Sequence, residues 1–301
     1  MVNILILQPC LLINLYQQIY YMKKDLHSHN LQINLNNYLY LYDLEGFYMF
    51  DFKEINKTYT YDGTFEGLLT IVFNCYVENI IPFNIINQNN YTPSIFETYE
   101  HIETDLEKSS RILNGISKSI SKECLYKNYT AFLSVANNKE TNILKYLLYG
   151  FKIGPEIDNM LSIDSVLIIE KIRKTIWFEA QRLKGFVRFT KIADELYYSV
   201  IEPDNNILEI LGEHFIRRFP NQNFVLHDKK RNIAFLYDTK KFSIVNADYI
   251  NIPNISLEEQ HYKDLWKAFV KAVAITERKN SRLQKQFMPK RYWKNMFETE
   301  H

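Results

Sequence analysis

The stretch Asn223–Asp238 reads NFVLHDKKRNIAFLYD, and it predicts a β-hairpin. Two runs rich in β-branched and aromatic residues, NFVLHD and NIAFLYD, flank the basic stretch 229–231. Two such runs with only a few polar residues between them are typical of antiparallel strands joined by a short turn. The second half of the chain is therefore expected to contain an antiparallel sheet.

The spacing of apolar residues changes at Lys184-Gly185, on the N-terminal side of this hairpin. After this point GFVRF (185–189) and LYYSVIEP (196–203) have the short alternating pattern of strands. The intervening segment 204–220, DNNILEILGEHFIRRFP, has the pattern of a helix that Pro220 ends. Before residue 184, apolar residues recur with helical spacing from about Asp164 onward.

Further helices are expected on both sides of this region. The turn signal Asp62-Gly63, followed by Thr64 as a candidate N-cap, begins the first of them. A capping box of Thr104 and Glu107 begins the second, and two more are expected near residues 122–135 and 139–151. A capping box of Ser256 and Glu259 begins the last helix, whose apolar stripe is formed by Tyr262, Leu265, Trp266, Phe269, Val270 and Val273.

This order of elements predicts an α+β fold. The N-terminal helical segments are expected to pack on an antiparallel sheet, which a C-terminal helix and a basic tail close. Residues 1–57 are expected to form an extension that contributes little to the core. One α+β domain is expected at 58–298, with its helical part at 58–184 and its sheet and C-terminal helix at 185–298.

The composition is that of a globular protein. Hydrophobic residues make up 47% and charged residues 24% of the 301 residues. The apolar N-terminal stretch that begins VNILILQPC is interrupted by polar residues, and no positive charge precedes it. It also lacks a small-residue cleavage site, so a signal peptide and a membrane span are both unexpected. We therefore expect no contact with a membrane.

The three cysteines, Cys10, Cys75 and Cys124, lie far apart and form no CxxC spacing. A structural zinc or an iron–sulfur cluster held by this chain alone would need closer spacing. We therefore expect no metal and no cofactor. Cys75 falls on an apolar helical stripe, which is typical of a buried thiol. Unpaired cysteines indicate a reducing compartment, so the expected location is the cytoplasm.

Charge is divided unevenly along the chain. Residues 1–170 have a balance of −7, whereas residues 171–296 have a balance of +10. Such a division suggests a polyanionic partner for the basic half. The alternative is that two solvated faces of opposite charge attract one another.

The basic residues of the second half form clusters, and the tail 290–294 reads KRYWK. Lys and Arg can contact phosphate, and Tyr292 and Trp293 can stack on unpaired bases. The expected nucleic-acid-binding residues are Arg182, Lys184, Arg188, Arg217, Arg218, Lys229, Lys230, Arg231, Arg278, Lys279, Lys285, Lys290, Arg291, Tyr292, Trp293 and Lys294. A tail of this composition is also compatible with docking onto its own domain.

Catalytic signals are weaker, since the chain has no Gly-rich phosphate loop, GxSxG or HExxH. The candidates are polar residues at the expected strand ends: Glu202, Asp204, His227 and Asp228. Adjacent strand residues point to opposite faces, so His227 and Asp228 cannot easily bond each other. Asp204 also suits a helix N-cap, and His214 falls on an apolar stripe that suits a buried histidine. Whether the chain is an enzyme stays open.

Five segments together resemble one bacterial family. They are YDGTFEGLLTIVF (61–73), QRLKGFVRF (181–189), IEPDNNIL (201–208), HFIRRFPNQNFVLHDKKRNIAFLYD (214–238) and ERKNSRLQKQFMPKRYWKNM (277–296). The resemblance spans about residues 59–298 and is to an uncharacterised family assigned to DNA metabolism or DNA repair. Members are commonly encoded beside a radical-SAM protein assigned to the same process, and some are fused behind a domain similar to uracil-DNA glycosylases.

The resemblance implies DNA, single-stranded or damaged, and the radical-SAM protein as partners. Asn205 departs from the family pattern, which usually has a histidine in this segment.

Three functions stay open on this basis. The first is a DNA-binding accessory to a DNA-modifying or repair enzyme. The second is a DNA-processing enzyme, namely a glycosylase, lyase or nuclease that acts on a flipped or damaged base. The third is a protein-interaction module with a basic docking face.

Overall fold

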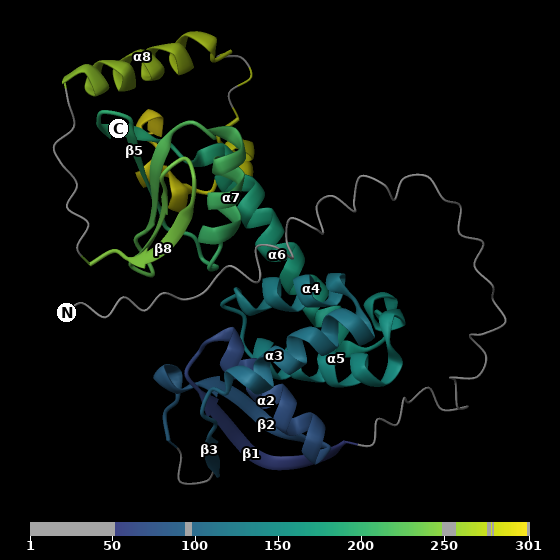
Figure 1. Ribbon diagram of the computed structural model, residues 1–301. Coiled ribbons are helices and arrows are strands. Elements are labelled where there is room, and N and C mark those ends of the chain that lie inside the picture. Colours follow the sequence, from purple (N-terminus) through teal and green to yellow (C-terminus); the bar gives the residue numbers. More distant parts are fainter. Residues whose placement is uncertain (1–51, 94–97, 249–256, 276–277, 279, 300–301) are drawn as a thin grey trace, which may run out of the picture. The chain divides into compact units, whose positions relative to one another are not determined.

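The computed structural model describes residues 52–93, 98–248, 257–275, 278 and 280–299 (Figure 1). These residues belong to two compact units. Of the described residues, the first unit contains those up to Phe132 and residues 137–171, and the second contains residues 133–136 and those from Ile172 onward. The expected α+β class is confirmed, because helices accompany a three-stranded and a five-stranded sheet.

The first unit contains a parallel sheet in a region that we expected to be helical. Its strands are β1 (Lys53–Tyr61), β2 (Ile80–Asn87) and β3 (Tyr99–His101), in the order β2-β1-β3. Helix α2 (Phe65–Glu78) connects β1 to β2. β1 begins at Lys53, so residues 53–57 of the expected extension lie within a strand. Most of the expected extension lies outside the described residues.

Helices α3 (Leu106–Gly115), α4 (Lys122–Phe132) and α5 (Lys139–Ile153) complete the first unit. As expected, Thr64 caps α2, and its hydroxyl accepts a hydrogen bond from the Gly67 N–H at 3.0 Å. The expected cap of α3 is wrong by one residue. Asp105 accepts the first N–H groups of α3, whereas the Thr104 hydroxyl donates to Asp62 at 2.8 Å. Cys75 and Cys124 are both buried free thiols.

The second unit is built on a five-stranded sheet. Helix α6 (Asp164–Phe186) leads into it, and the sheet has the order β4-β5-β6-β7-β8. The strands are β4 (Thr190–Ala193), β5 (Leu196–Ile201), β6 (Asn223–Asp228), β7 (Ile233–Tyr237) and β8 (Phe242–Asn246). The predicted hairpin is confirmed as the antiparallel pair β6–β7.

The expectation of a fully antiparallel sheet is wrong, because β5 and β6 run parallel. Helix α7 (Leu208–Arg218) lies between them in the chain. A helical crossover of this kind carries the chain back to the end of the sheet where β5 began, so the next strand runs in the same direction. The interpretation of Asp204 as a helix cap is also wrong, since α7 begins at Leu208 with Ile207 at the cap position.

Helix α7 packs on one face of this sheet with an aromatic contact at its centre. The rings of Phe215 on α7 and Phe224 on β6 pack edge to face, and both residues are buried. Gly212 lies so close to β7 that an added Cβ would be 2.4 Å from the Phe235 ring. The missing side chain at Gly212 therefore sets the separation between helix and sheet.

The chain ends with α8 (Leu257–Val273), α9 (Ser281–Phe287) and two short 3-10 turns, Lys290–Asn295 and Phe297–Thr299. The apolar stripe expected on α8 is present, but Tyr262, Leu265 and Phe269 are each more than half exposed. Ser256, the expected cap of this helix, lies outside the described residues. Within the described ranges, no helix has both the length and the apolar composition needed to cross a bilayer.

Replacing Gly212 with Ala should destabilise the protein by about 1–3 kcal/mol, because the new methyl group overlaps the Phe235 ring. The matched control is Gly185→Ala, also in a helix, where an added Cβ meets nothing within 4 Å. It should stabilise by up to about 1 kcal/mol, since alanine favours helix more than glycine does. Urea unfolding of both variants tests this, and equal effects would contradict the close approach of α7 to the sheet.

Candidate nucleic-acid interface

A buried carboxylate organises the loop between β5 and α7. Glu179, in α6, is 4% exposed. Its two oxygens accept hydrogen bonds from the backbone N–H of Asp204 at 2.7 Å and of Asn205 at 3.0 Å. The Asn205 side-chain amide donates a further bond at 2.6 Å. One carboxylate therefore accepts all three hydrogen bonds, and hydrogen bonds to carboxylates are among the stronger ones in proteins.

Asn205 uses both ends of its side chain in this arrangement. Its Oδ1 accepts bonds from the Ser134 hydroxyl and the Val135 backbone N–H, each at 3.1 Å. Its Nδ2 binds Glu179, as described. Asn205 therefore has a structural role, joining residues 133–136 to α6.

The aromatic tail reaches the same carboxylate. The Tyr292 hydroxyl donates to Glu179 at 3.0 Å and accepts a bond from Arg291 at 2.9 Å. Burial raises the pKa of Tyr292 to about 12, so the hydroxyl keeps its proton at neutral pH. Its ring is 2% exposed and packs near Phe186. A ring in this position has no free face on which a base could stack.

Trp293 also contacts its own chain. Its indole N–H donates to the Met288 carbonyl at 2.8 Å, and the Lys290 ammonium lies 5.9 Å from the centre of its ring. Tyr292 thus docks the tail onto α6, whereas these contacts of Trp293 lie within the tail itself.

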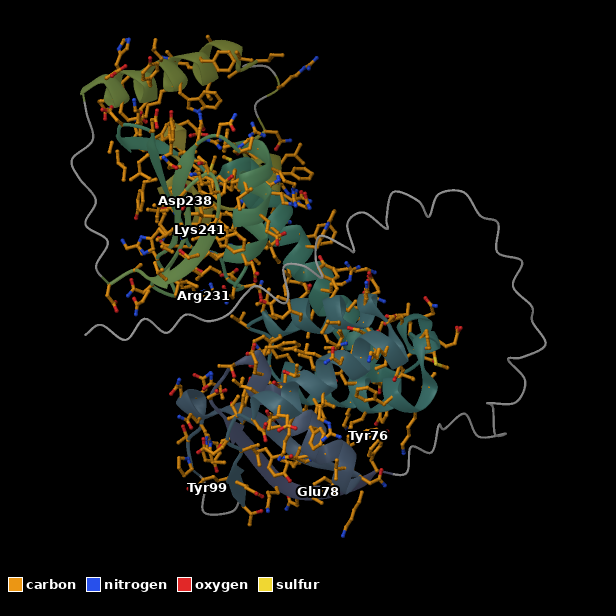
Figure 2. All side chains as sticks on the ribbon, in the orientation of Figure 1. Tyr76, Glu78, Tyr99, Arg231, Asp238 and Lys241 are labelled. Atoms are coloured by element: carbon orange, nitrogen blue, oxygen red, sulfur yellow. The ribbon has the colours of Figure 1, made fainter. Side chains whose placement is uncertain are left out.

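A second buried carboxylate holds the hairpin against the same loop. Asp228, fully buried at the end of β6, accepts bonds from the Lys230 and Arg231 backbone N–H groups and from the Arg231 guanidinium at 2.8 Å. Arg231 also donates to the carbonyl groups of Pro203 and Asp204. Arg231 follows β6 at one end of the β6–β7 hairpin (Figure 2). The hairpin turn is therefore fixed to the loop through one arginine.

The other acidic candidates are paired with cations. Asp204 lies 3.0 Å from Arg291 and 3.5 Å from Lys230, and Glu202 pairs with Lys294. Asp228 pairs with Arg231, so each of the three carboxylates proposed for catalysis faces a basic residue. Several of the expected nucleic-acid contacts neutralise these acids.

His227 lies apart from this cluster. Its Nδ1 is 2.6 Å from the Tyr198 hydroxyl, and burial lowers the pKa of its ring. Its Nε2 is buried and has no hydrogen-bond partner within the described part of the chain. Neighbouring positions on a strand project to opposite faces, as expected for His227 and Asp228. No group of three or more His, Cys, Asp or Glu among the described residues could hold a metal ion.

A separate cleft of about 520 Å³ gathers basic and aromatic side chains in the second unit. It is formed by the end of α6, the segment that follows it, α7, α8 and the last 3-10 turn. Its cationic lining is Lys184, Arg188, Arg218 and Lys263. Its aromatic lining is Phe189, Phe215, Phe219, Tyr262, Trp266 and Phe297.

The charges of this cleft influence one another. Burial and the nearby Arg217 lower the pKa of Lys184. Burial, followed by Lys184, Arg217 and Arg218, lowers the pKa of His214 on the same helix as the two arginines. For both groups burial is the larger cause, and the neighbouring cations lower the pKa further.

One cation of the cleft is held by an acid. Arg188 donates to Glu298 from Nε at 3.0 Å and from Nη2 at 2.6 Å. Its guanidinium lies 5.7 Å from the centre of the Trp266 ring. The paired arginine thus fixes the chain end beside an aromatic wall of the cleft.

The expected binding residues are divided between these two places. Lys184, Arg188 and Arg218 line the cleft, whereas Lys230, Arg231, Arg291, Tyr292 and Lys294 belong to the polar cluster around Glu179 and Asp228. Arg217 pairs with Glu213 at 4.0 Å. The exposed residues outside both places are Arg182, Lys229, Arg278, Lys285 and Lys290. Lys279 lies outside the described residues.

Sequence reasoning missed Glu179 and the α8 contribution of Lys263 and Trp266. Glu179 has a polar side chain within a helix, which gives no sign of burial. Lys263 and Trp266 are three residues apart, so they share a helix face. A cation beside an aromatic residue on one face was the sequence signal that could have indicated this side of the cleft.

The model of a domain of unknown function, DUF4130, matches residues 137–298. The chain belongs to the DUF4130 family. The match covers α5, α6, the five-stranded sheet and the tail, and it includes every residue of the cleft and all of the polar cluster except Ser134 and Val135. No curated protein matches the chain.

Replacing Asn205 with Asp should destabilise this DUF4130 domain by about 3–5 kcal/mol at pH 7, because it places a second charged oxygen against Glu179. The like charge and burial raise the pKa of the introduced carboxyl above its unfolded value. Its ionisation therefore costs stability above the folded pKa, and the cost disappears as the pH falls below about 4. Urea unfolding at pH 7 and at pH 4 measures the difference.

The matched control is Asn206→Asp, one position along the chain and partly exposed. It should change the free energy of unfolding by less than about 0.5 kcal/mol. Equal losses for the two variants, or a loss for Asn205→Asp that does not depend on pH, would contradict the assigned role of Asn205.

Proposed function

We propose that this protein binds nucleic acid through the cleft between α7 and α8, as an accessory to a DNA-modifying or repair enzyme. The observation that carries the proposal is the lining of the cleft, in which four cations and six aromatic rings share one cavity of about 520 Å³. Phosphate contacts need Lys and Arg, whereas flat aromatic faces suit bases. A ligand that offers both phosphate and bases matches this mixture.

The electrostatics of the cleft favour an anion. Burial lowers the pKa of Lys184, and repulsion by the nearby Arg217 lowers it further. A phosphate group placed there would relieve this repulsion and would also gain attraction to Arg218 and Lys263. Glu259 is the single acidic residue in the lining that the described chain provides. The site therefore has a clear excess of positive charge.

The accessory role is supported by the state of the candidate catalytic acids. Glu202, Asp204 and Asp228 each face a cation, and Asp228 is fully buried. Carboxylates used in this way stabilise the fold and are poorly placed to take a proton from a substrate. The resemblance to proteins assigned to DNA repair implies that a radical-SAM partner carries out the chemistry.

The test is the salt dependence of binding to a fluorescent single-stranded oligonucleotide, followed by anisotropy. Each phosphate neutralised on single strands contributes about −0.7 to the slope of log affinity against log salt. Replacing Lys184, Arg218 and Lys263 together with Ala should therefore flatten the slope by roughly two units. The wild-type protein provides the reference slope.

A triple variant of equal charge is the control. Lys53, Lys118 and Lys240 lie outside the cleft lining, and their replacement by Ala should leave the slope nearly unchanged. Equal flattening by both triple variants would contradict the cleft as the binding site. A wild-type protein without salt-sensitive affinity for DNA would remove the proposal and favour the protein-interaction module.

A further inference from the structure

We infer that the cleft receives an unpaired base of single-stranded DNA, stacked on Trp266, so that the protein selects single strands over duplex. This inference rests on the proposed function and specifies its ligand. The observations that carry it are the size of the cleft, the placement of Trp266 and the positions of the cations.

The size of the cleft suits one base and its sugar. Its volume of about 520 Å³ falls within the range of roughly 300–1,000 Å³ that accommodates one small-molecule ligand. The faces of bases in a duplex are covered by their neighbours in the stack and cannot reach aromatic walls inside a cavity of this size. Bases of a single strand expose these faces and can turn toward an aromatic ring.

Trp266 is the side chain best placed to stack. It is 40% exposed although it lines the cleft, so part of its ring remains available. The Arg188 guanidinium lies over one face of this ring, 5.7 Å from its centre, and is itself held by Glu298 and by the Gly185 carbonyl. A tryptophan ring held by a fixed guanidinium loses less conformational entropy on binding than a freely rotating ring does. A base on Trp266 would therefore meet a prepared surface.

The cleft lining also provides cations that the phosphate groups of such a strand can contact. Arg218 is exposed on α7, its guanidinium lies 5.6 Å from the Phe219 ring centre, and Lys184 lines the same cleft. Lys263 follows from α8, 5.6 Å from the Phe297 ring centre. Aromatic rings and positive charges thus share the lining. A basic groove with stacking rings is the arrangement by which proteins hold single strands.

The test compares Trp266→Ala with Trp177→Ala, using a 20-nucleotide single strand and the duplex of the same sequence. Trp177 is a matched control, since it is 48% exposed on α6 and does not line the cleft. Stacking contributes about 1–3 kcal/mol per base, which corresponds to a loss of about 5- to 160-fold in single-strand affinity for Trp266→Ala. The salt slope should stay unchanged because stacking is not ionic, and Trp177→Ala should bind like wild type.

Trp266→Phe keeps an aromatic ring in the cleft, so it tests stacking even if the alanine variant does not fold. It should retain most of the affinity, and thermal unfolding of each variant reports its fold. Duplex affinity equal to or above single-strand affinity would overturn the inference and leave the proposed function standing. Equal losses for the Trp266 and Trp177 variants would also overturn it. Absence of salt-sensitive binding to either DNA would instead remove the proposed function itself.

Discussion

The arrangement of the second unit depends on the burial of the Glu179 carboxylate. Three parts of the chain supply its hydrogen bonds or their support: the loop after β5, residues 133–136 through Asn205, and the tail through Tyr292. A carboxyl group that is 4% exposed is tolerated only when hydrogen-bond donors surround it. The three parts are therefore held together by the hydrogen bonds that Glu179 needs. Loss of any one part would leave this buried carboxylate with too few hydrogen-bond donors.

The polar cluster and the cleft divide the basic residues between two tasks. Arg231, Arg291 and Lys294 neutralise acids of the cluster and so stabilise the fold. Lys184, Arg218 and Lys263 line the cleft, where Glu259 is the single acid among the described lining residues. Part of the positive charge of the basic half is therefore used in internal ion pairs. These pairs lie within this half and do not test the alternative that two solvated faces of opposite charge attract one another.

What could be predicted from the sequence was local. The hairpin at 223–238 was predictable because both strands and the turn lie within one short stretch. The strand β1, KEINKTYTY, was missed because its first half is polar and largely exposed. The parallel pairing of β5 with β6 depends on where α7 carries the chain, which no local pattern encodes. Lys184 and Arg218 were predicted as binding residues from their charge. Trp266 was assigned only to an apolar stripe, because the sequence does not show which parts of the chain cover such a stripe.

The contact between Tyr292 and Glu179 joins residues that are 113 positions apart, and the pair of Arg188 with Glu298 spans 110. Closing loops of this length has an entropic cost that slows folding. The tail is also synthesised after both of its partners and after the strands of the sheet. The polar core of the second unit is therefore completed late, after its sheet has been synthesised. Until then, Glu179 depends on water for part of its solvation, and the nascent chain exposes the surface that the tail will cover.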